Sequence, residues 1–227
     1  MNWTPAEFEK RLRAVPEERY HHLHPFNVRM HAGDLSPEEI RRWILNRFHY
    51  QRHIPIKDAL ILSKLDSSEL RRMWVRRIHD HDGTEPGEGG IERWLRLGEA
   101  AGLHRDALLS GEGVLPGVRL AVDGYVNLCR LGTPLEAVAA SLTELFAPDI
   151  MRTRIEAFER HYTWIDAEGL QYFRNRVTQG RQDSGEALAL VMDWARTEAE
   201  QESAVAALRF KCDLLWSLLD AIDRASE

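Results

Sequence analysis

The chain has 227 residues, of which 44% are hydrophobic and 29% charged, and its formal net charge is -6. This composition suits one globular domain with a substantial core. The acidic balance disfavours a nucleic-acid partner, which normally requires a basic surplus, and an anionic ligand would need a local basic pocket.

The hydrophobic periodicity is helical along nearly the whole chain. Thr4, Ser36 and Thr133 each precede a proline and, three residues on, a glutamate, the pattern of a capped helix start. Helix ends are expected at Gly33, Gly83, Gly102, Gly132 and Gly180. The predicted helices are 4–14, 18–32, 37–65 with a bend at Pro55, 68–81, 91–101, 117–131, 134–146, 149–161, 166–179, 184–199 and 201–224. No alternating strand pattern remains, so we predict an all-α bundle forming a single domain over residues 1–227.

Polar side chains interrupt several apolar helix faces. Lys211 lies on the stripe of Leu208, Leu215 and Leu218 in the stretch ALRFKCDLLWSLLDAI. Its ammonium group could extend out of the bundle, or it could stay partly buried and receive an anionic group.

Two further helices carry polar pairs one turn apart, Arg47 with Gln51 and Tyr172 with Arg176, and Tyr125 lies on a third apolar stripe. Each pair alone is more often structural than functional. Inward polar groups from several helices together favour a shared site.

Glu144 stands in the last turn of a predicted helix, where the helix dipole disfavours an anion. It therefore requires either a nearby cation or a functional role. His81 lies in RIHDHDG at another helix end, where a histidine can simply cap the helix or can belong to a site.

Eight of the ten histidines lie in the first 81 residues, including three in RYHHLHPF. Glu18 and His21 form an ExxH pair, which is half of a carboxylate-bridged di-metal site. No second ExxH exists, so we predict no metal site.

The two cysteines, Cys129 and Cys212, form no disulfide framework or zinc motif. The N-terminal stretch is charged and unlike a signal peptide, and no apolar run approaches the roughly 20 residues needed to cross a bilayer. We therefore expect a cytoplasmic protein without a membrane partner.

Several long strings resemble the pyrroloquinoline-quinone synthase (PqqC) family: YHHLHPF, NRFHYQRHIPIKDA, RIHDHDG, GGIERWLRLGEAAGL, VLPGVRLAVDGYVNL, SLTELFAP and LRFKCDLLWSLLDAI. They occur in the same order and at comparable spacing from about residue 5 to residue 224. The resemblance implies a heme-oxygenase-like helical fold and a homodimer without metal or organic cofactor. It also implies ring closure and oxidation of the bicyclic precursor AHQQ to pyrroloquinoline quinone (PQQ) by O2, with release of hydrogen peroxide.

The resemblance also implies the site residues. Those with an implied catalytic role are His21, His81, Glu144, Tyr172 and Arg176. Those with an implied substrate-binding role are Tyr20, Arg47, Gln51, Tyr125, Met151, Arg154, Lys211 and Leu215. We hypothesise that His81, Tyr172 and Arg176 surround the position that reacts with oxygen, while His21 and Glu144 help to move protons.

Met151 departs from the family pattern, which has a histidine at this place. A thioether cannot shuttle a proton, so this difference puts turnover in doubt more than ligand binding. The family resemblance also raises a PqqD-like domain or partner as an expectation.

Two alternatives remain open from the sequence. One is a di-metal oxidase on the same fold, although Tyr172, Arg176 and Gln179 stand where such an enzyme would place its ligands. The other is a non-catalytic protein that binds a quinone, which Met151 makes conceivable.

Overall fold

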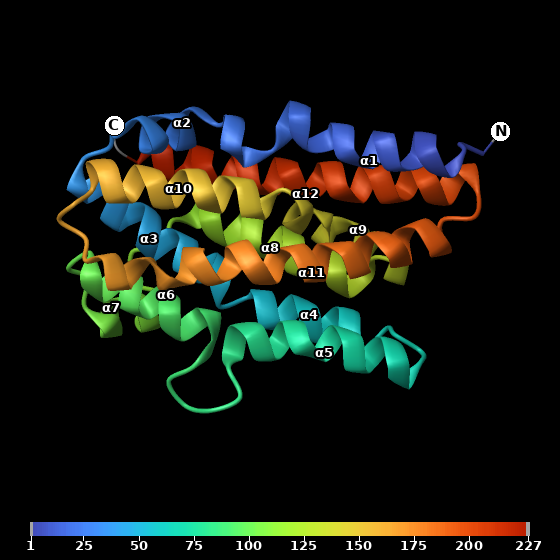
Figure 1. The fold of residues 1–227 in the computed structure, drawn as a ribbon, viewed down its shortest axis with the longest axis horizontal. Helices are drawn as coiled ribbons and strands as arrows, with labels where there is room; N and C mark the ends of the chain where they lie inside the picture. Colours follow the sequence, from blue (N-terminus) through green and yellow to red (C-terminus); the bar gives the residue numbers. More distant parts are fainter. Residues whose placement is uncertain (1, 226–227) are drawn as a thin grey trace.

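The computed structural model describes residues 2–225, and for residues 178–184 it describes the helix but not the side chains. Every regular element in this part of the chain is a helix, which confirms the predicted all-α class (Figure 1). The α-helices are α1 (Pro5–Arg19), α2 (Pro25–Ala32), α3 (Pro37–Gln51), α4 (Ile54–Leu62), α5 (Ser68–Asp82), α6 (Gly89–Ala100), α7 (Arg105–Ser110), α8 (Pro116–Leu131), α9 (Pro134–Ala140), α10 (Ala147–His161), α11 (Gln171–Trp194) and α12 (Glu198–Arg224). Three short 3-10 helices are η1 (His21–Leu23), η2 (Ser141–Leu145) and η3 (Ala167–Leu170).

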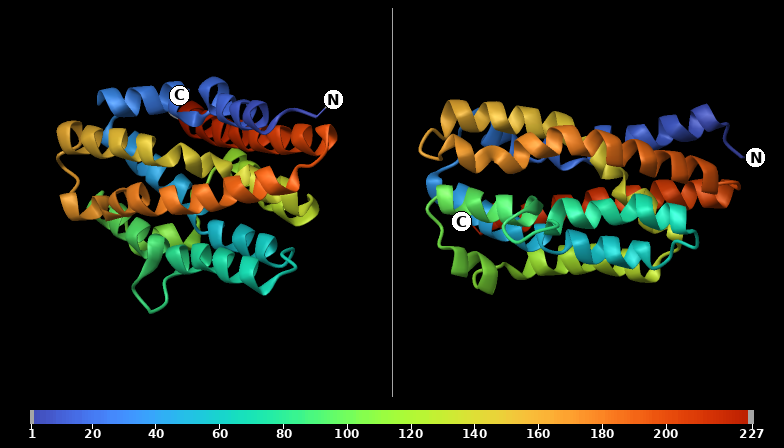
Figure 2. Two further views of the ribbon diagram at one scale, coloured as in Figure 1. Left: turned by 45° about the vertical axis from the view of Figure 1, so that its right-hand side comes forward. Right: turned by 60° about the horizontal axis from the view of Figure 1, so that its bottom comes forward.

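The long helices run roughly parallel to the long axis of the molecule (Figures 1 and 2). Helix α12 packs against α1, α8 and α9, while α10 and α11 lie side by side. Helices α4 and α5 form a hairpin at one side of the bundle. None of the described helices is long and apolar enough to span a membrane.

Aromatic side chains from four helices form the centre of the core. Trp43 of α3 lies 5.5 Å from Trp94 of α6 between ring centroids, and 6.2 Å from Phe158 of α10. Phe173 of α11 stacks on Trp43 at 6.3 Å. These four rings are essentially inaccessible to solvent. Because burying a large apolar side chain stabilises a fold by about 1.5–3 kcal/mol, this cluster fixes α3, α6, α10 and α11 relative to one another.

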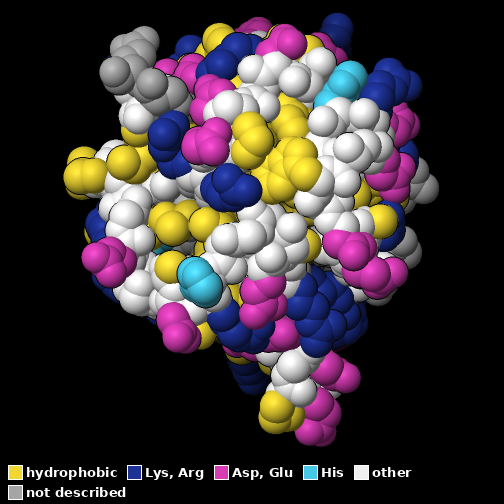
Figure 3. Space-filling model, turned by 90° about the vertical axis from the view of Figure 1, so that its left-hand side faces the viewer, with side chains coloured by type: hydrophobic (Ala, Val, Ile, Leu, Met, Phe, Trp, Pro, Cys, Tyr) yellow, Lys and Arg dark blue, Asp and Glu magenta, His cyan; other side chains and the backbone are white. Residues whose placement is uncertain are grey.

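On the face drawn in Figure 3, basic and acidic side chains are interspersed around hydrophobic ones, and neither sign dominates.

The predicted helix starts at Thr4, Ser36 and Thr133 are capping boxes in the structure, with a proline in the first turn. Thr197 forms a further capping box at the start of α12, which was not predicted. Gly33 ends α2 in the left-handed conformation, with φ of 86°, where glycine has no steric penalty.

The prediction of one helix over residues 18–32 was wrong. Helix α1 continues past Pro16 to Arg19, and Tyr20 and His24 are extended, with ψ of 143° and 136°. The residue before a proline avoids the helical conformation, so Pro25 separates η1 from α2. The predicted helix 37–65 is likewise two helices, because Arg52 and His53 separate α3 from α4 just before Pro55.

The prediction of a break near Gly180 was also wrong, since α11 continues to Trp194. A single glycine costs a helix only about 1 kcal/mol relative to alanine, and packing along a long bundle offsets that cost. The predicted helix 134–146 ends early, at Ala140, and continues as η2. The short helix α7 was not predicted.

Two glycines, Gly87 in the loop between α5 and α6 and Gly89 at the start of α6, share a left-handed φ but have different surroundings. Gly89 has φ of +83°, and a Cβ there would lie 2.4 Å from the backbone nitrogen of Gly83 and 2.5 Å from the carbonyl oxygen of His81. Gly87 has φ of +86° but nothing within 4 Å of the equivalent position. A side chain at Gly87 would therefore meet only the strain of its φ, whereas one at Gly89 would also clash with the backbone.

We expect Gly89→Ala to lower the free energy of unfolding by about 2–4 kcal/mol, because it adds a backbone clash to a strained φ. The matched variant Gly87→Ala carries the strain alone and should cost about 1–2 kcal/mol. Urea titration measures both. Equal losses in the two variants would contradict the role of the close backbone approach.

Candidate active site

An internal cavity lies where α3, α5, α10, α11 and η2 meet η1. Of the predicted site residues, all except Tyr125 and Lys211 line it: Tyr20, His21, Arg47, Gln51, His81, Glu144, Met151, Arg154, Tyr172, Arg176 and Leu215. Its free volume is about 50 Å³. That space holds a few water molecules, so the surrounding side chains must move to admit a bicyclic ligand.

The helical spacing brings the predicted pairs to the cavity together. Arg47 and Gln51 stand one turn apart on α3, and Tyr172 and Arg176 one turn apart on α11, so each pair shares a helix face. The Tyr172 hydroxyl donates a hydrogen bond of 2.8 Å to Gln51 Oε1 and thereby joins the two helices. Burial raises the pKa of the Tyr172 hydroxyl, which keeps it a neutral donor.

The charge around the cavity is mainly positive, since Arg47, Arg154 and Arg176 face a single carboxylate, Glu144. Burial and the neighbouring Arg47 lower the pKa of Arg154 to about 9. The Arg154 guanidinium lies 4.9 Å above the Trp43 ring, and its Nε has no hydrogen-bond partner in the described part of the chain. Buried cations that repel each other favour an anionic ligand, which would neutralise them.

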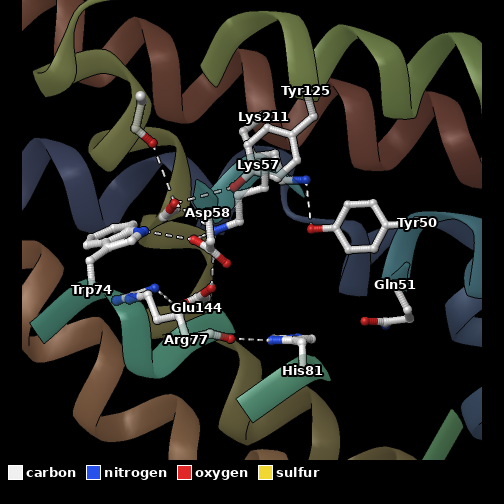
Figure 4. Close-up of polar contacts among 12 residues, drawn as sticks. Tyr50, Gln51, Lys57, Asp58, Trp74, Arg77, His81, Tyr125, Glu144 and Lys211 are labelled. Carbon is white, nitrogen blue, oxygen red and sulfur yellow. Dashed lines mark hydrogen bonds and ion pairs between the residues drawn. The ribbon is translucent and has the colours of Figure 1, made fainter. Parts of the chain in front are cut away.

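Lys211 does not extend into solvent. Its ammonium group is buried, donates to the Tyr50 hydroxyl at 2.8 Å and lies 3.4 Å from the centroid of the Tyr125 ring (Figure 4). Tyr50 and Tyr125 stack with 7° between their planes. Tyr50 lines the cavity, whereas Lys211 and Tyr125 do not. Both contact Tyr50, so they can influence a ligand in the cavity through the Tyr50 side chain.

Glu144 has the nearby cations that a helix-end carboxylate requires. Its Oε2 accepts a hydrogen bond of 2.5 Å from Arg77 Nη1, and its Oε1 lies 3.9 Å from Lys57 Nζ (Figure 4). Burial alone would raise the pKa of this carboxyl, but Arg77, Lys57 and Arg176 outweigh burial and lower it to about 2. Glu144 is therefore ionised at neutral pH, accepts hydrogen bonds and has no proton to donate.

Next to Glu144 lies a buried ion pair formed by Lys57 and Asp58. Lys57 Nζ lies 2.7 Å from Asp58 Oδ1 and 3.2 Å from Ser141 Oγ, and the Trp74 indole donates to Asp58 at 3.0 Å (Figure 4). Both charged side chains are almost fully buried. Neither was predicted, although two charges in the apolar helix IPIKDALIL are a signal that sequence reasoning could have used.

His81 presents an unpartnered nitrogen. Its Nδ1 lies 3.0 Å from the carbonyl oxygen of Arg77, which can only accept, so Nδ1 carries the proton and Nε2 is a free lone pair. Among the described residues, Nε2 has no hydrogen-bond partner. Burial and Arg176 lower the pKa of His81 to about 3, so the imidazole is neutral at physiological pH.

This shift predicts a pH dependence of stability. In the unfolded chain His81 binds a proton below its ordinary pKa of 6.5, but in the folded chain only near 3. Between these values the unfolded state binds more protons, so the free energy of unfolding falls as the pH falls. We expect His81→Gln to reduce this slope by about 1.4 kcal/mol per pH unit between pH 6 and 4, measured by urea titration. An identical slope in the two proteins would contradict a neutral buried His81.

The histidines of RYHHLHPF have separate roles in the structure. His21 is buried and lines the cavity, and Asn27 Nδ2 lies 3.0 Å from its Nδ1. His24 is the N-cap of α2, and its Nδ1 accepts a hydrogen bond from the Phe26 backbone N–H, as expected for a residue at a helix end. His22 is exposed.

The two residues of the ExxH pair do not share one helix, because Glu18 is exposed at the end of α1 while His21 is buried in η1. Within the described residues, no three His, Cys, Asp or Glu side chains gather where they could hold a metal ion. The side chain of Gln179, considered above as a counterpart of a metal ligand, lies outside the described ones.

Five further residues line the cavity and were not predicted: Tyr50, Ile54, Trp94, Thr143 and Ala147. Most are apolar or lie beside a residue that was chosen. Tyr50, for example, directly precedes Gln51, and nothing in its spacing distinguished it from a core tyrosine.

A sequence profile of the TENA/THI-4/PQQC family matches residues 9–221. A Granulibacter bethesdensis protein named pyrroloquinoline-quinone synthase is 53% identical to the chain over 219 residues, which cover 96% of this chain and 86% of that protein. A Cronobacter sakazakii protein of the same name is 52% identical over 222 residues, covering 98% and 88%. Among solved structures, a Shewanella denitrificans domain of unknown function with a heme oxygenase-like fold superposes with a TM-score of 0.80 at 14% identity, covering 99% of this chain and 94% of that one. This last similarity shows the heme oxygenase-like fold.

Proposed function

The chain belongs to the TENA/THI-4/PQQC family, and we propose that it is a pyrroloquinoline-quinone synthase, an enzyme that closes a ring in AHQQ and oxidises the product to PQQ with O2. The observation that carries this proposal is the cavity lined by three arginines, three phenols and two histidines. AHQQ and PQQ carry several carboxylates, which arginine binds through paired hydrogen bonds.

The residues that line the cavity have different proposed roles in the reaction. His81 Nε2, neutral and without a partner among the described side chains, is the base that accepts a proton from the substrate. Arg176 and the Tyr172 hydroxyl stabilise the negative charge that then develops on the ring system. In each two-electron oxidation the substrate loses two electrons and two protons, and one O2 becomes H2O2.

We propose that this oxidation proceeds without a metal or organic cofactor, because the substrate itself supplies the electrons. A water-poor site assists, since charges and hydrogen bonds act more strongly where water is excluded. Glu144, ionised at neutral pH, balances the arginines rather than donating protons.

The decisive test is aerobic incubation of the purified protein with AHQQ. We expect the PQQ chromophore to form together with hydrogen peroxide. Tight binding of PQQ without turnover would instead favour the non-catalytic quinone-binding alternative. Metal analysis of the same sample addresses the di-metal oxidase, because stoichiometric iron or manganese that is required for turnover would contradict the cofactor-free proposal.

The oligomeric state, the cellular compartment and association with a partner protein are also proposed. We propose a homodimer in the cytoplasm that acts alone on AHQQ or with a PqqD-like partner, and sedimentation of the protein with and without such a partner would measure both associations. Met151 lines the cavity, and the family resemblance of the sequence implies a histidine at this place. We propose that His21 and His81 carry the proton transfers that this position cannot.

A further inference from the structure

Asn27 of α2 lies behind the cavity and connects two residues that line it. Its side chain is fully buried and does not itself line the cavity. The amide nitrogen Nδ2 lies 2.7 Å from the backbone carbonyl oxygen of His21 and 3.0 Å from His21 Nδ1. The amide oxygen accepts a hydrogen bond of 3.2 Å from Arg154 Nη2.

The orientation of this amide is fixed by two partners, each of which has only one hydrogen-bonding role. The carbonyl oxygen of His21 can only accept, so it must face the amide nitrogen. The Arg154 guanidinium can only donate, so it must face the amide oxygen. Rotating the amide by 180° would place two acceptors together at one end and two donors at the other.

This orientation determines which His21 nitrogen carries the proton. Asn27 Nδ2 offers only N–H groups, so His21 Nδ1 must accept, and in a neutral imidazole the proton then lies on Nε2. Burial, with Arg47 and Arg154 nearby, lowers the pKa of His21 well below its usual value, so the ring is neutral.

We propose that Asn27 is a positioning residue that locks His21 in the tautomer that donates through Nε2. His81 is held in the opposite tautomer by the Arg77 carbonyl, so the cavity contains one imidazole that donates and one that accepts. His21, close to Arg47 and Arg154, then binds an anionic oxygen of the ligand. Assigning that oxygen to AHQQ rests on the proposed function, but the tautomer assignment does not.

The tautomer is measured directly by ¹⁵N NMR of protein labelled at histidine, with the His21 signals assigned by their absence in His21→Gln. We expect His21 to show a protonated Nε2 and an unprotonated Nδ1 at neutral pH. Protonation at Nδ1 in the wild-type protein would overturn the proposal, whatever the behaviour of any variant.

Asn27→Asp supplies the second arm of the test. A carboxylate keeps an acceptor for Arg154 but can no longer donate, so the proton of His21 should move to Nδ1. His24 is an internal control, because its Nδ1 accepts from the Phe26 backbone N–H and its tautomer should not change. An unchanged His21 tautomer in a folded Asn27→Asp protein would also refute the role of Asn27. If this variant does not fold, the wild-type spectrum still tests whether His21 carries its proton on Nε2.

The functional consequence is read from turnover. Losing a hydrogen bond to a charged group corresponds to a reduction of roughly tenfold to a hundredfold in kcat/KM for Asn27→Asp. An inverted tautomer with unchanged turnover would show that Asn27 orients His21 without serving the reaction. Failure of the wild-type protein to form PQQ would refute the proposed function alone, because the tautomer measurement requires no substrate.

Discussion

His81→Ala is expected to lower the rate of PQQ formation by about 10²–10⁴-fold, the usual contribution of a positioned general base. The variant removes the neutral imidazole whose Nε2 has no hydrogen-bond partner among the described residues. It leaves the three cavity arginines in place, so PQQ should still bind. Stopped-flow absorbance measures the oxidation, and equilibrium titration with PQQ measures the binding.

A matched control comes from the same helix end. His79→Ala removes an exposed imidazole two residues away, and this variant should oxidise AHQQ at the wild-type rate. If His81→Ala oxidised AHQQ as fast as His79→Ala, the base would have to be another group, and His21 would be the first to examine. A loss of PQQ binding in His81→Ala would instead indicate a structural role.

Much of the fold follows from the local chemistry of the chain. Capping boxes and prolines mark helix starts at Thr4, Ser36 and Thr133 because each satisfies backbone N–H groups within four residues. The errors arise where tertiary packing decides. Gly180 resembles a helix end locally, yet α11 continues because its neighbours in the bundle support it.

The candidate site was predictable where polar residues recur one turn apart on an apolar helix. Arg47 with Gln51 and Tyr172 with Arg176 therefore face one cavity, as expected. The residues behind the cavity were not predictable, because Arg77 reaches Glu144, and Asn27 reaches Arg154, from a helix distant in sequence. Glu144 illustrates the difference: its position demanded a cation, but only the fold identifies Arg77 and Lys57 as the cations.

The electrostatics of the cavity also depend on the residues behind it. The lining residues alone form a positive site. The ion pair of Lys57 with Asp58 lies next to the single lining carboxylate, Glu144. Desolvating an ion costs several kcal/mol, and a buried pair is tolerable only while both partners remain. The pair of Lys57 with Asp58 is therefore the part of the site whose disruption should affect stability most.

Lys57→Met is expected to lower the free energy of unfolding by about 3–5 kcal/mol, because it leaves Asp58 buried without its cation. Asp58 Oδ2 lacks a hydrogen-bond partner among the described residues, and the nearest other cation, Arg77, is already paired with Glu144. For a chain of this size the melting temperature should fall by roughly 6–20 °C. Lys10→Met, at an exposed position, makes the same chemical change and should have almost no effect.

The double variant Lys57→Met/Asp58→Asn separates charge from packing. Asparagine keeps an oxygen that can accept from the Trp74 indole, while the pair becomes neutral on both sides. Since removing both charges abolishes the unpaired one, this protein should regain most of the stability lost in Lys57→Met. If urea titration found the double variant no more stable than the single one, Lys57 would stabilise the bundle through packing or through Glu144, and the buried ion pair would not explain its effect.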